Sequence, residues 1–196
     1  MTRVALFGGS FNPPHVAHQL VALYVLETQP VDELWFMPVY DHVFGKHLVS
    51  FDDRVAMCEL AAAALGPRVK VSRVEEAWAK HPDFQGSRTY DVIQYLKSTQ
   101  PGIAPRLVIG TDILAETAKW HRWADVVAAA PLIVIGRPGH PLPEGSAATG
   151  LTMPEVSSTQ VREALRGEGA PRCDAELRSL LPASVLEYID SRKLYR

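Results

Sequence analysis

Two histidines, His15 and His18, lie three residues apart just after a turn-forming stretch near the N-terminus. The stretch follows an apolar run at 4–7, typical of a buried strand, and consists of Gly8, Gly9, Ser10 and Phe11. Backbone N–H groups at such a turn, and at the start of the helix after it, bind phosphate oxygens. Imidazoles beside them could donate hydrogen bonds where negative charge develops in a transition state. The stretch therefore predicts phosphate binding together with chemistry.

Each part of this stretch also has a structural alternative. Two glycines after a strand can form a plain tight turn, and the histidines can be one capping or packing residue and one surface residue. A metal pair is a further alternative, but two imidazoles are too few ligands and the spacing fixes no third one. The glycines match neither G-x-G-x-x-G nor the P-loop pattern, which disfavours a hydride-transfer cofactor site and a P-loop.

A second anion site is predicted where Ser157, Ser158 and Thr159 open a helix, with Arg162 following three residues later. Hydroxyls, free N–H groups and a guanidinium at a helix start attract an anion. An ordinary helix cap with a surface arginine is the alternative.

Other strand ends carry further candidates. Gly110 and Asp112 follow an apolar run, so the carboxylate could meet a ribose or an amide donor, or simply cap a helix. Trp120 could stack on a planar ring, although tryptophan more often packs in a core. Lys46 and His47, in an aperiodic segment, fit a solvated loop.

Strand-like and helical patterns alternate along the chain. Strands are predicted at 4–7, 33–39, 68–74, 106–110 and 131–139, with a short sixth at 150–156. Helices are predicted at 18–28, 51–65, 88–98, 110–130 (one or two), 157–167 and 182–196, and loops at 40–50, 75–87 and 141–150. The apolar face of the first helix is expected to contain Leu20, Leu23, Tyr24 and Leu26. This order predicts one α/β domain, residues 1–196, with a Rossmann-like, doubly wound parallel sheet of five to six strands. Ligands in such sheets bind beyond the carboxyl ends of the strands.

Composition excludes several classes of protein. The 196 residues are 47% hydrophobic and 21% charged, which fits a folded core and not a disordered chain. A net charge of −2 argues against a nucleic-acid or membrane-surface protein, and no apolar run is long enough to span a membrane. Two distant cysteines, and an N-terminus without a signal-peptide pattern, predict a cytoplasmic protein. The sequence leaves open whether the protein forms a homo-oligomer.

Two of these motifs resemble the signatures of a known superfamily. The stretch GGSFNPPHVAH resembles the G-G-T-F-D-P-x-H-x-G-H signature of the HxGH nucleotidyltransferases, and SSTQVR resembles their I-S-S-T-x-x-R signature. GTDILAETAKWHRW, LIVIGRPGH and LLPASVLEYIDSRKLYR narrow the resemblance to nicotinate-nucleotide adenylyltransferases. The resemblance runs from the first predicted strand to the last helix.

The resemblance implies a magnesium-dependent transfer of AMP from ATP to nicotinate mononucleotide, which gives deamido-NAD and pyrophosphate. His15, His18 and Arg162 would then act in catalysis. The residues implied to bind ATP are Gly8, Gly9, Ser10, Phe11, His15, His18, Gly110, Asp112, Ser158, Thr159 and Arg162. Trp120 would stack on the pyridine ring, and Lys46 and Asp112 would also contact the acceptor.

The chain departs from the family pattern in three places. Ala17 replaces the second glycine of the first signature, a small change in a helical turn. YDHVFGKH replaces the family's P-P-H-K loop, and RTYD at 88–91 stands where the family has S-Y-T. The last two departures fall on the acceptor side. Nicotinamide mononucleotide or another phosphorylated acceptor therefore remains an alternative, as do a non-catalytic nucleotide sensor and a dinucleotide-binding dehydrogenase.

Overall fold

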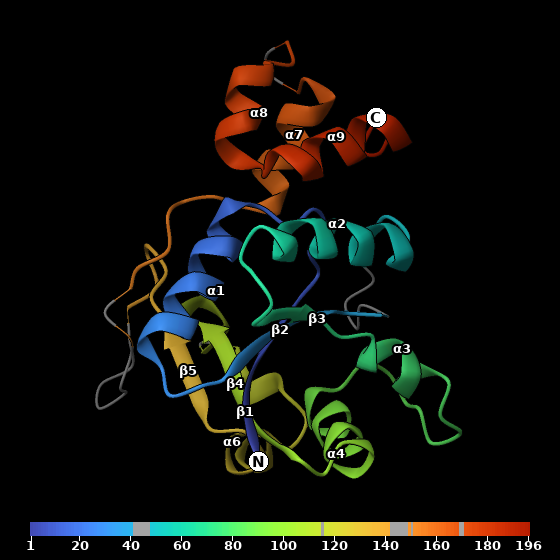
Figure 1. The fold of residues 1–196 in the computed structure, drawn as a ribbon, viewed down its shortest axis with the longest axis vertical. Coiled ribbons are helices and arrows are strands. Elements are labelled where there is room, and N and C mark those ends of the chain that lie inside the picture. Colours follow the sequence, from blue (N-terminus) through green and yellow to red (C-terminus); the bar gives the residue numbers. More distant parts are fainter. Residues whose placement is uncertain (41–47, 115, 142–148, 150, 169–170) are drawn as a thin grey trace.

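The computed structural model describes residues 1–40, 48–114, 116–141, 149, 151–168 and 171–196. In this part of the chain five strands form one parallel sheet in the order β3-β2-β1-β4-β5 (Figure 1). Their bounds are β1 (Thr2–Gly9), β2 (Glu33–Pro38), β3 (Val69–Val71), β4 (Ile103–Gly110) and β5 (Leu132–Ile135). The strand order reverses between β1 and β4, which is the place where doubly wound sheets bind ligands. The predicted fold class is confirmed.

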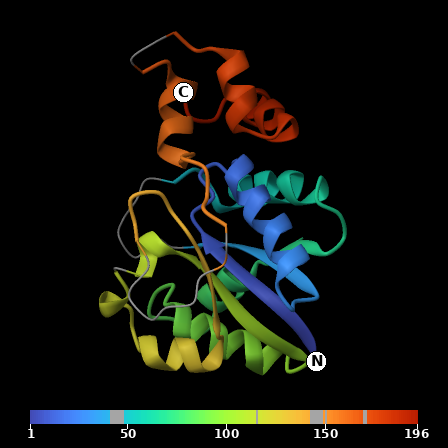
Figure 2. The same ribbon diagram turned by 90° about the vertical axis from the view of Figure 1, so that its left-hand side faces the viewer.

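Helices cover both faces of the sheet (Figures 1 and 2). One face carries α1 (Val16–Thr28) and α2 (Phe51–Ala63), and the other carries α3 (Val74–Ala79), α4 (Thr89–Thr99) and α6 (Trp123–Ala129). Alternate residues of β1 supply the two cores, because Ala5 packs toward α1 and α2 while Val4 and Leu6 pack toward α4 and α6.

A third group of helices lies beyond the carboxyl ends of the strands (Figures 1 and 2). It consists of α7 (Ser158–Arg166), α8 (Asp174–Leu180) and α9 (Ala183–Arg192). Their buried residues, including Val161, Leu177 and Ile189, form a core with Met57 and Ala61 of α2. The chain's C-terminal part is thereby held over the edge of the sheet where β1 ends.

The first predicted helix forms, but its buried face matches the predicted one only in part: Leu26 is buried and Tyr24 packs against the core, as predicted. Leu20 and Leu23 are 47% and 50% exposed, whereas Ala17, Val21 and Val25 are fully buried. Small and β-branched side chains let the helix approach the sheet closely, and Leu20 and Leu23 remain outside. The apolar character of this helix all round its axis hid the choice of face from sequence analysis.

Two other element predictions were wrong. The segment 75–87, predicted as a loop, contains part of α3, because Val74 and Trp78 anchor one helical turn in the core. The sixth strand at 150–156 is reduced to one bridge between Gly136 and Thr152 in the described chain. Pro154, which has no N–H group, lies two residues further on and prevents the ladder from continuing.

The segment 110–130 resolves into α5 (Thr111–Leu114), a 3-10 turn (η1, Thr117–Lys119) and α6, in line with the two-helix alternative. The closing helix ends earlier than predicted, at Arg192, because Lys193 adopts left-handed backbone angles with φ 54°. Most of the two predicted loops at 40–50 and 141–150 lies outside the described residues, and Lys46 and His47 lie there too.

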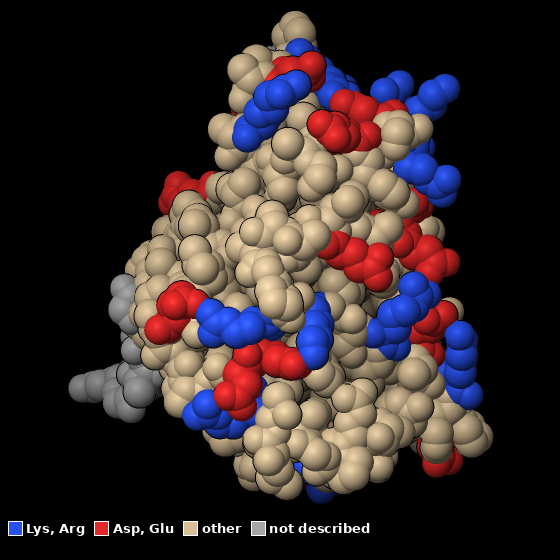
Figure 3. All heavy atoms as spheres, viewed as in Figure 1, with Lys and Arg blue, Asp and Glu red and all other residues tan. Residues whose placement is uncertain are grey.

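The face drawn in Figure 3 carries basic and acidic side chains interspersed, with no continuous basic stripe. No helix in the described ranges is both long and apolar enough to cross a bilayer.

Candidate active site

The turn after β1 is built so that the main chain stays accessible. Gly8 is exposed, and a side chain there would meet no neighbouring atom. A β-carbon at Gly9 would lie 3.3 Å from the ring of Phe11. Phe11 itself is 1% exposed and packs against Phe7 and Phe36, so it can offer a ligand only its main chain. The turn that the glycines predicted is therefore formed, and the phosphate site stays a prediction.

The two predicted histidines are brought together at the start of α1. Their ring centroids are 3.8 Å apart and the rings are tilted by 32°. The backbone N–H group of His15 donates to Nδ1 of His18 at 3.1 Å. Since Nδ1 of His18 accepts this bond, the proton of its neutral ring is on Nε2, which is left to donate to another group. Nδ1 of His15 is buried and has no hydrogen-bond partner among the described residues.

Burial keeps both imidazoles uncharged at neutral pH. It lowers the pKa of His15 to about 3, with a smaller contribution from the positive charge of Arg137. The pKa of His18 is also well below its ordinary value, because of burial first and then of His15 and Arg137. Two neutral N–H donors at a helix N-terminus are suited to bind phosphate oxygens, and a bound anion would raise both pKa values.

The lowered pKa of His15 predicts a loss of stability in mild acid. The unfolded chain binds a proton near pH 6.5 and the folded chain near pH 3, so the free energy of unfolding falls as the pH drops below 6.5. Urea unfolding at pH 7 and pH 5.5 measures the effect. Wild type should lose about 1 kcal/mol more than His15→Asn between these two pH values, since one pKa unit corresponds to about 1.4 kcal/mol. Equal losses in the two proteins would contradict the burial of a neutral His15.

The start of α7, which carries the second motif, closes onto the turn. Ser158 donates its hydroxyl to the carbonyl of Pro13 at 2.9 Å. Arg162 donates to the carbonyl of Asn12 at 2.8 Å and to Thr159 Oγ1 at 3.1 Å. Two segments about 150 residues apart in sequence thus form one site.

Arg54 of α2 supports the same turn through hydrogen bonds to main-chain carbonyl groups. It is 1% exposed and donates to the carbonyl of Ser10 at 3.0 Å and to that of Val49 at 3.2 Å. Burial lowers its pKa, yet an arginine stays charged at neutral pH. The guanidinium therefore adds positive charge behind the turn.

Asp112 and Arg137 form an ion pair at the ends of β4 and β5, with Nε and Oδ2 3.3 Å apart. A β-carbon on Gly110 would collide with the Asp112 carboxylate and lie 3.3 Å from Cδ of Arg137. The absence of a side chain at Gly110 is what admits the pair. The N–H group of Arg137 donates to Thr111 Oγ1 at 2.8 Å, which fixes β5 relative to α5.

A cavity of about 230 Å³ lies beside this pair. It is lined by Arg137, Pro138, His140, Pro154, Glu155, Val156 and Ser157. The cavity therefore connects the end of β5 with the segment that enters α7.

Trp120 lies apart from the histidines, in the core on the α4 and α6 side of the sheet. It is half-buried, and its ring packs edge-on against Trp123 with centroids 5.5 Å apart. Near it, Arg122 lies over the ring of Tyr90 at 4.1 Å, which joins the 88–91 stretch to this segment.

Sequence analysis missed three residues that shape the site. Arg137 lies near the carboxyl end of the strand predicted at 131–139, and that position is the signal that could have identified it. Arg54 could have been noticed as a lone arginine facing the apolar side of its helix. Asn12 is 2% exposed, and its side-chain oxygen accepts from the N–H group of Val49 at 3.2 Å. Only the folded chain reveals that role.

Comparisons with known proteins match the sequence and the fold of this chain. The family model described as "Cytidylyltransferase-like" matches residues 6–164. A protein of Anaeromyxobacter dehalogenans named "Probable nicotinate-nucleotide adenylyltransferase" is 44% identical over 194 residues, which cover 98% of this chain and 96% of that protein. A Myxococcus xanthus protein of the same name is 38% identical, with 98% and 94% covered. The fold matches "Plasmodium falciparum nicotinic acid mononucleotide adenylyltransferase complexed with NaAD" with a TM-score of 0.81, at 18% identity and with 100% and 98% of the two chains covered.

Proposed function

The chain belongs to the nicotinate-nucleotide adenylyltransferase family of cytidylyltransferase-like enzymes, and from this we propose that it transfers AMP from ATP to nicotinate mononucleotide. The products are deamido-NAD and pyrophosphate. The observation that carries the proposal is the two-part site, in which Arg162 and Ser158 of α7 are bonded to the turn before the paired histidines.

In the proposed reaction a phosphate oxygen of the mononucleotide attacks the α-phosphorus of ATP. A new P–O bond forms, the bond from the α-phosphorus to the bridging oxygen breaks, and pyrophosphate leaves with the bond's electron pair. No covalent enzyme intermediate is required, so the protein's contribution is positioning and charge stabilisation.

The proposed ATP site combines main-chain and side-chain groups. Neutral His15 and His18 are suited to hold the phosphates and to donate to the oxygens on which charge increases. The guanidinium of Arg162 and the free N–H groups of the first turn of α7 would bind the triphosphate tail. The turn (Gly8, Gly9, Ser10 and the main chain of Phe11), with Gly110, Asp112, Ser158 and Thr159, would line the rest.

Magnesium is proposed to enter as part of the ATP complex. Among the described residues no three His, Cys, Asp or Glu side chains form a metal-binding cluster. Mg²⁺ is commonly held by phosphates and water with few protein ligands, so the site needs no dedicated cage. Bound magnesium would neutralise phosphate charge, while the imidazoles and guanidinium orient the phosphates.

The acceptor is the part of the proposal that depends on Trp120, Asp112 and Lys46. Trp120 offers an indole beside the Arg122–Tyr90 pair, and Lys46 lies outside the described residues. The pyridine ring is proposed to stack on Trp120.

Steady-state pyrophosphate release with ATP and either the acid or the amide mononucleotide tests the proposal. We expect a higher kcat/KM with nicotinate mononucleotide than with nicotinamide mononucleotide. The opposite order would assign the amide as the acceptor. Turnover with neither compound would overturn the proposed acceptor, and the additional absence of ATP binding would overturn the assigned nucleotide site.

A further inference from the structure

The last residues of the chain fold back onto the turn that carries His15. Lys193 and Tyr195 both have left-handed backbone angles, with φ 54° and 61°, and they reverse the chain after α9. The N–H group of Leu194 donates to the carbonyl of Ile189 at 3.0 Å, which fixes this reversal. The hydroxyl of Tyr195 then donates to Oδ1 of Asn12 at 2.9 Å, across 183 residues of sequence.

Asn12 joins three parts of the molecule. Its side-chain oxygen accepts from Tyr195 and also from the N–H group of Val49, just before α2. Its main-chain carbonyl accepts from Arg162 of α7. A side-chain amide oxygen has two lone pairs, so the two bonds to Oδ1 use both of them. Because Asn12 is only three residues before His15, its orientation fixes the path of the chain into the histidine pair.

Tyr195 is suited to remain a donor at every physiological pH. Burial raises the pKa of its hydroxyl, although the nearby Arg162 and Arg54 oppose the rise. The ring lies among the apolar residues of the α7–α9 core. The hydroxyl therefore has a fixed place, and its proton points to Asn12.

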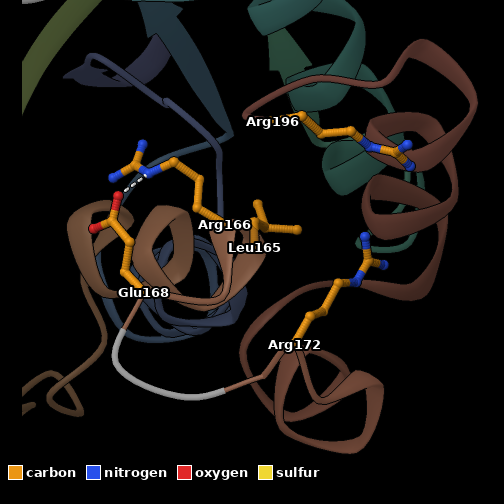
Figure 4. A pocket seen from close by; sticks show the side chains of 5 residues that line it. All are labelled: Leu165, Arg166, Glu168, Arg172 and Arg196. Atoms are coloured by element: carbon orange, nitrogen blue, oxygen red, sulfur yellow. Dashed lines mark hydrogen bonds and ion pairs between the residues drawn. The ribbon is translucent and has the colours of Figure 1, made fainter.

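The C-terminal tail, residues 193–196, and the helix α9 before it are anchored by other contacts as well. Arg172 binds both carboxylate oxygens of Asp190 at 2.7 Å, and Arg196 lies 3.8 Å from the same carboxylate. In Figure 4 the ends of Arg172 and Arg196 converge at the side of a pocket of about 670 Å³. Removing the Tyr195 hydroxyl should therefore leave the tail in place.

On α9 itself, Tyr188 donates to Oδ1 of Asp53 at 2.9 Å, and Arg192 lies 3.4 Å from the same oxygen. The Tyr188 bond is a hydroxyl contact of the same length and from the same part of the chain as that of Tyr195, but it ends on the first turn of α2 and not on Asn12. Tyr188 is thus a matched control.

We propose that Tyr195 is a positioning residue for the active site, which holds Asn12 and thereby the turn that places His15 and His18. The proposal rests on the adenylyl-transfer function proposed above. It assigns to the C-terminal tail a part in the reaction, because displacement of a catalytic group by about 1 Å can cost orders of magnitude in rate.

The test compares Tyr195→Phe with Tyr188→Phe. We expect Tyr195→Phe to lower kcat about fivefold to tenfold, since one neutral hydrogen bond contributes roughly that factor. The KM for ATP should change less than twofold, because the phosphate-binding groups remain. Tyr188→Phe should lower the melting temperature by about as much as Tyr195→Phe does, and it should leave kcat unchanged. Equal kcat values for the two variants, or a loss in both that follows their stability, would overturn the proposal.

A second readout is independent of activity. The imidazole C–H resonances of His15 and His18 depend on the stacking of their rings, so they should shift in Tyr195→Phe and stay in place in Tyr188→Phe. If the wild type transfers no adenylyl group, the proposed function fails while this measurement still decides whether Tyr195 holds the turn. Unshifted resonances in Tyr195→Phe would overturn the positioning role in either case.

Discussion

Replacing His18 by alanine is expected to lower kcat by about 10²-fold or more, the usual effect of removing a donor that stabilises transition-state charge. The structure explains why this side chain should matter so much. Nδ1 of His18 is engaged by the N–H group of His15, and burial keeps the ring neutral, so Nε2–H is its remaining donor. Alanine removes that donor and also leaves the N–H group of His15 without its acceptor. Steady-state pyrophosphate release measures the loss.

His81→Ala is the control for this prediction. His81 stacks on Trp78 with centroids 5.0 Å apart, on the other side of the sheet. Its replacement by alanine should therefore leave kcat unchanged. Alanine is a good helix former, so the His18 variant should keep its fold. A His18→Ala protein with wild-type kcat would contradict a role for this imidazole in the reaction.

Replacing Arg162 by methionine is expected to lower kcat/KM about 10²-fold, because a charge-assisted hydrogen bond is worth about 1.5–3 kcal/mol. Arg162 joins the two halves of the site, since it bonds to the carbonyl of Asn12 and to Thr159. Methionine keeps the aliphatic stem but removes both contacts and the positive charge. The KM for ATP should rise, and kcat should fall. Lysine should restore only part of the loss, because it has the charge without the planar fork.

Arg166→Met is the matched control, four residues further along the same helix. Arg166 pairs with Glu168 at the surface and does not contact the turn. Both variants lose one arginine from α7, so a general effect on the helix would appear in both. Equal kcat/KM values for Arg162→Met and Arg166→Met would contradict the two-part site.

Local patterns in the sequence were enough to predict the sheet and to single out the two motifs that the structure brings together. Apolar runs of four to seven residues followed by turn residues identify buried parallel strands, whichever side chains they pack against. The two motifs containing His15 and Arg162 lie at strand and helix ends, where the topology of a doubly wound sheet brings them together. Their closeness follows from the fold class.

What could not be predicted depends on contacts between distant segments. The exposed position of Leu20 follows from how closely α1 approaches the sheet, which no pattern within the helix reveals. The low pKa of His15 follows from burial under the turn, and the ion pair of Arg137 depends on the absence of a side chain at Gly110. The bond from Tyr195 to Asn12 joins the two ends of the chain.

The function proposed for this site is transfer of the adenylyl group of ATP by attack at the α-phosphorus. Two ATP analogues test it most directly, each offered with nicotinate mononucleotide. The β,γ-methylene analogue keeps the oxygen between the α- and β-phosphorus atoms, so it should yield deamido-NAD and methylenebisphosphonate. The α,β-methylene analogue has carbon at the bond to be broken, so it should bind and give no product. Turnover of the α,β-methylene analogue would show that the bond to the α-phosphorus is not the one that breaks. A β,γ-methylene analogue that gives no product, while ATP reacts, would likewise rule out attack at the α-phosphorus.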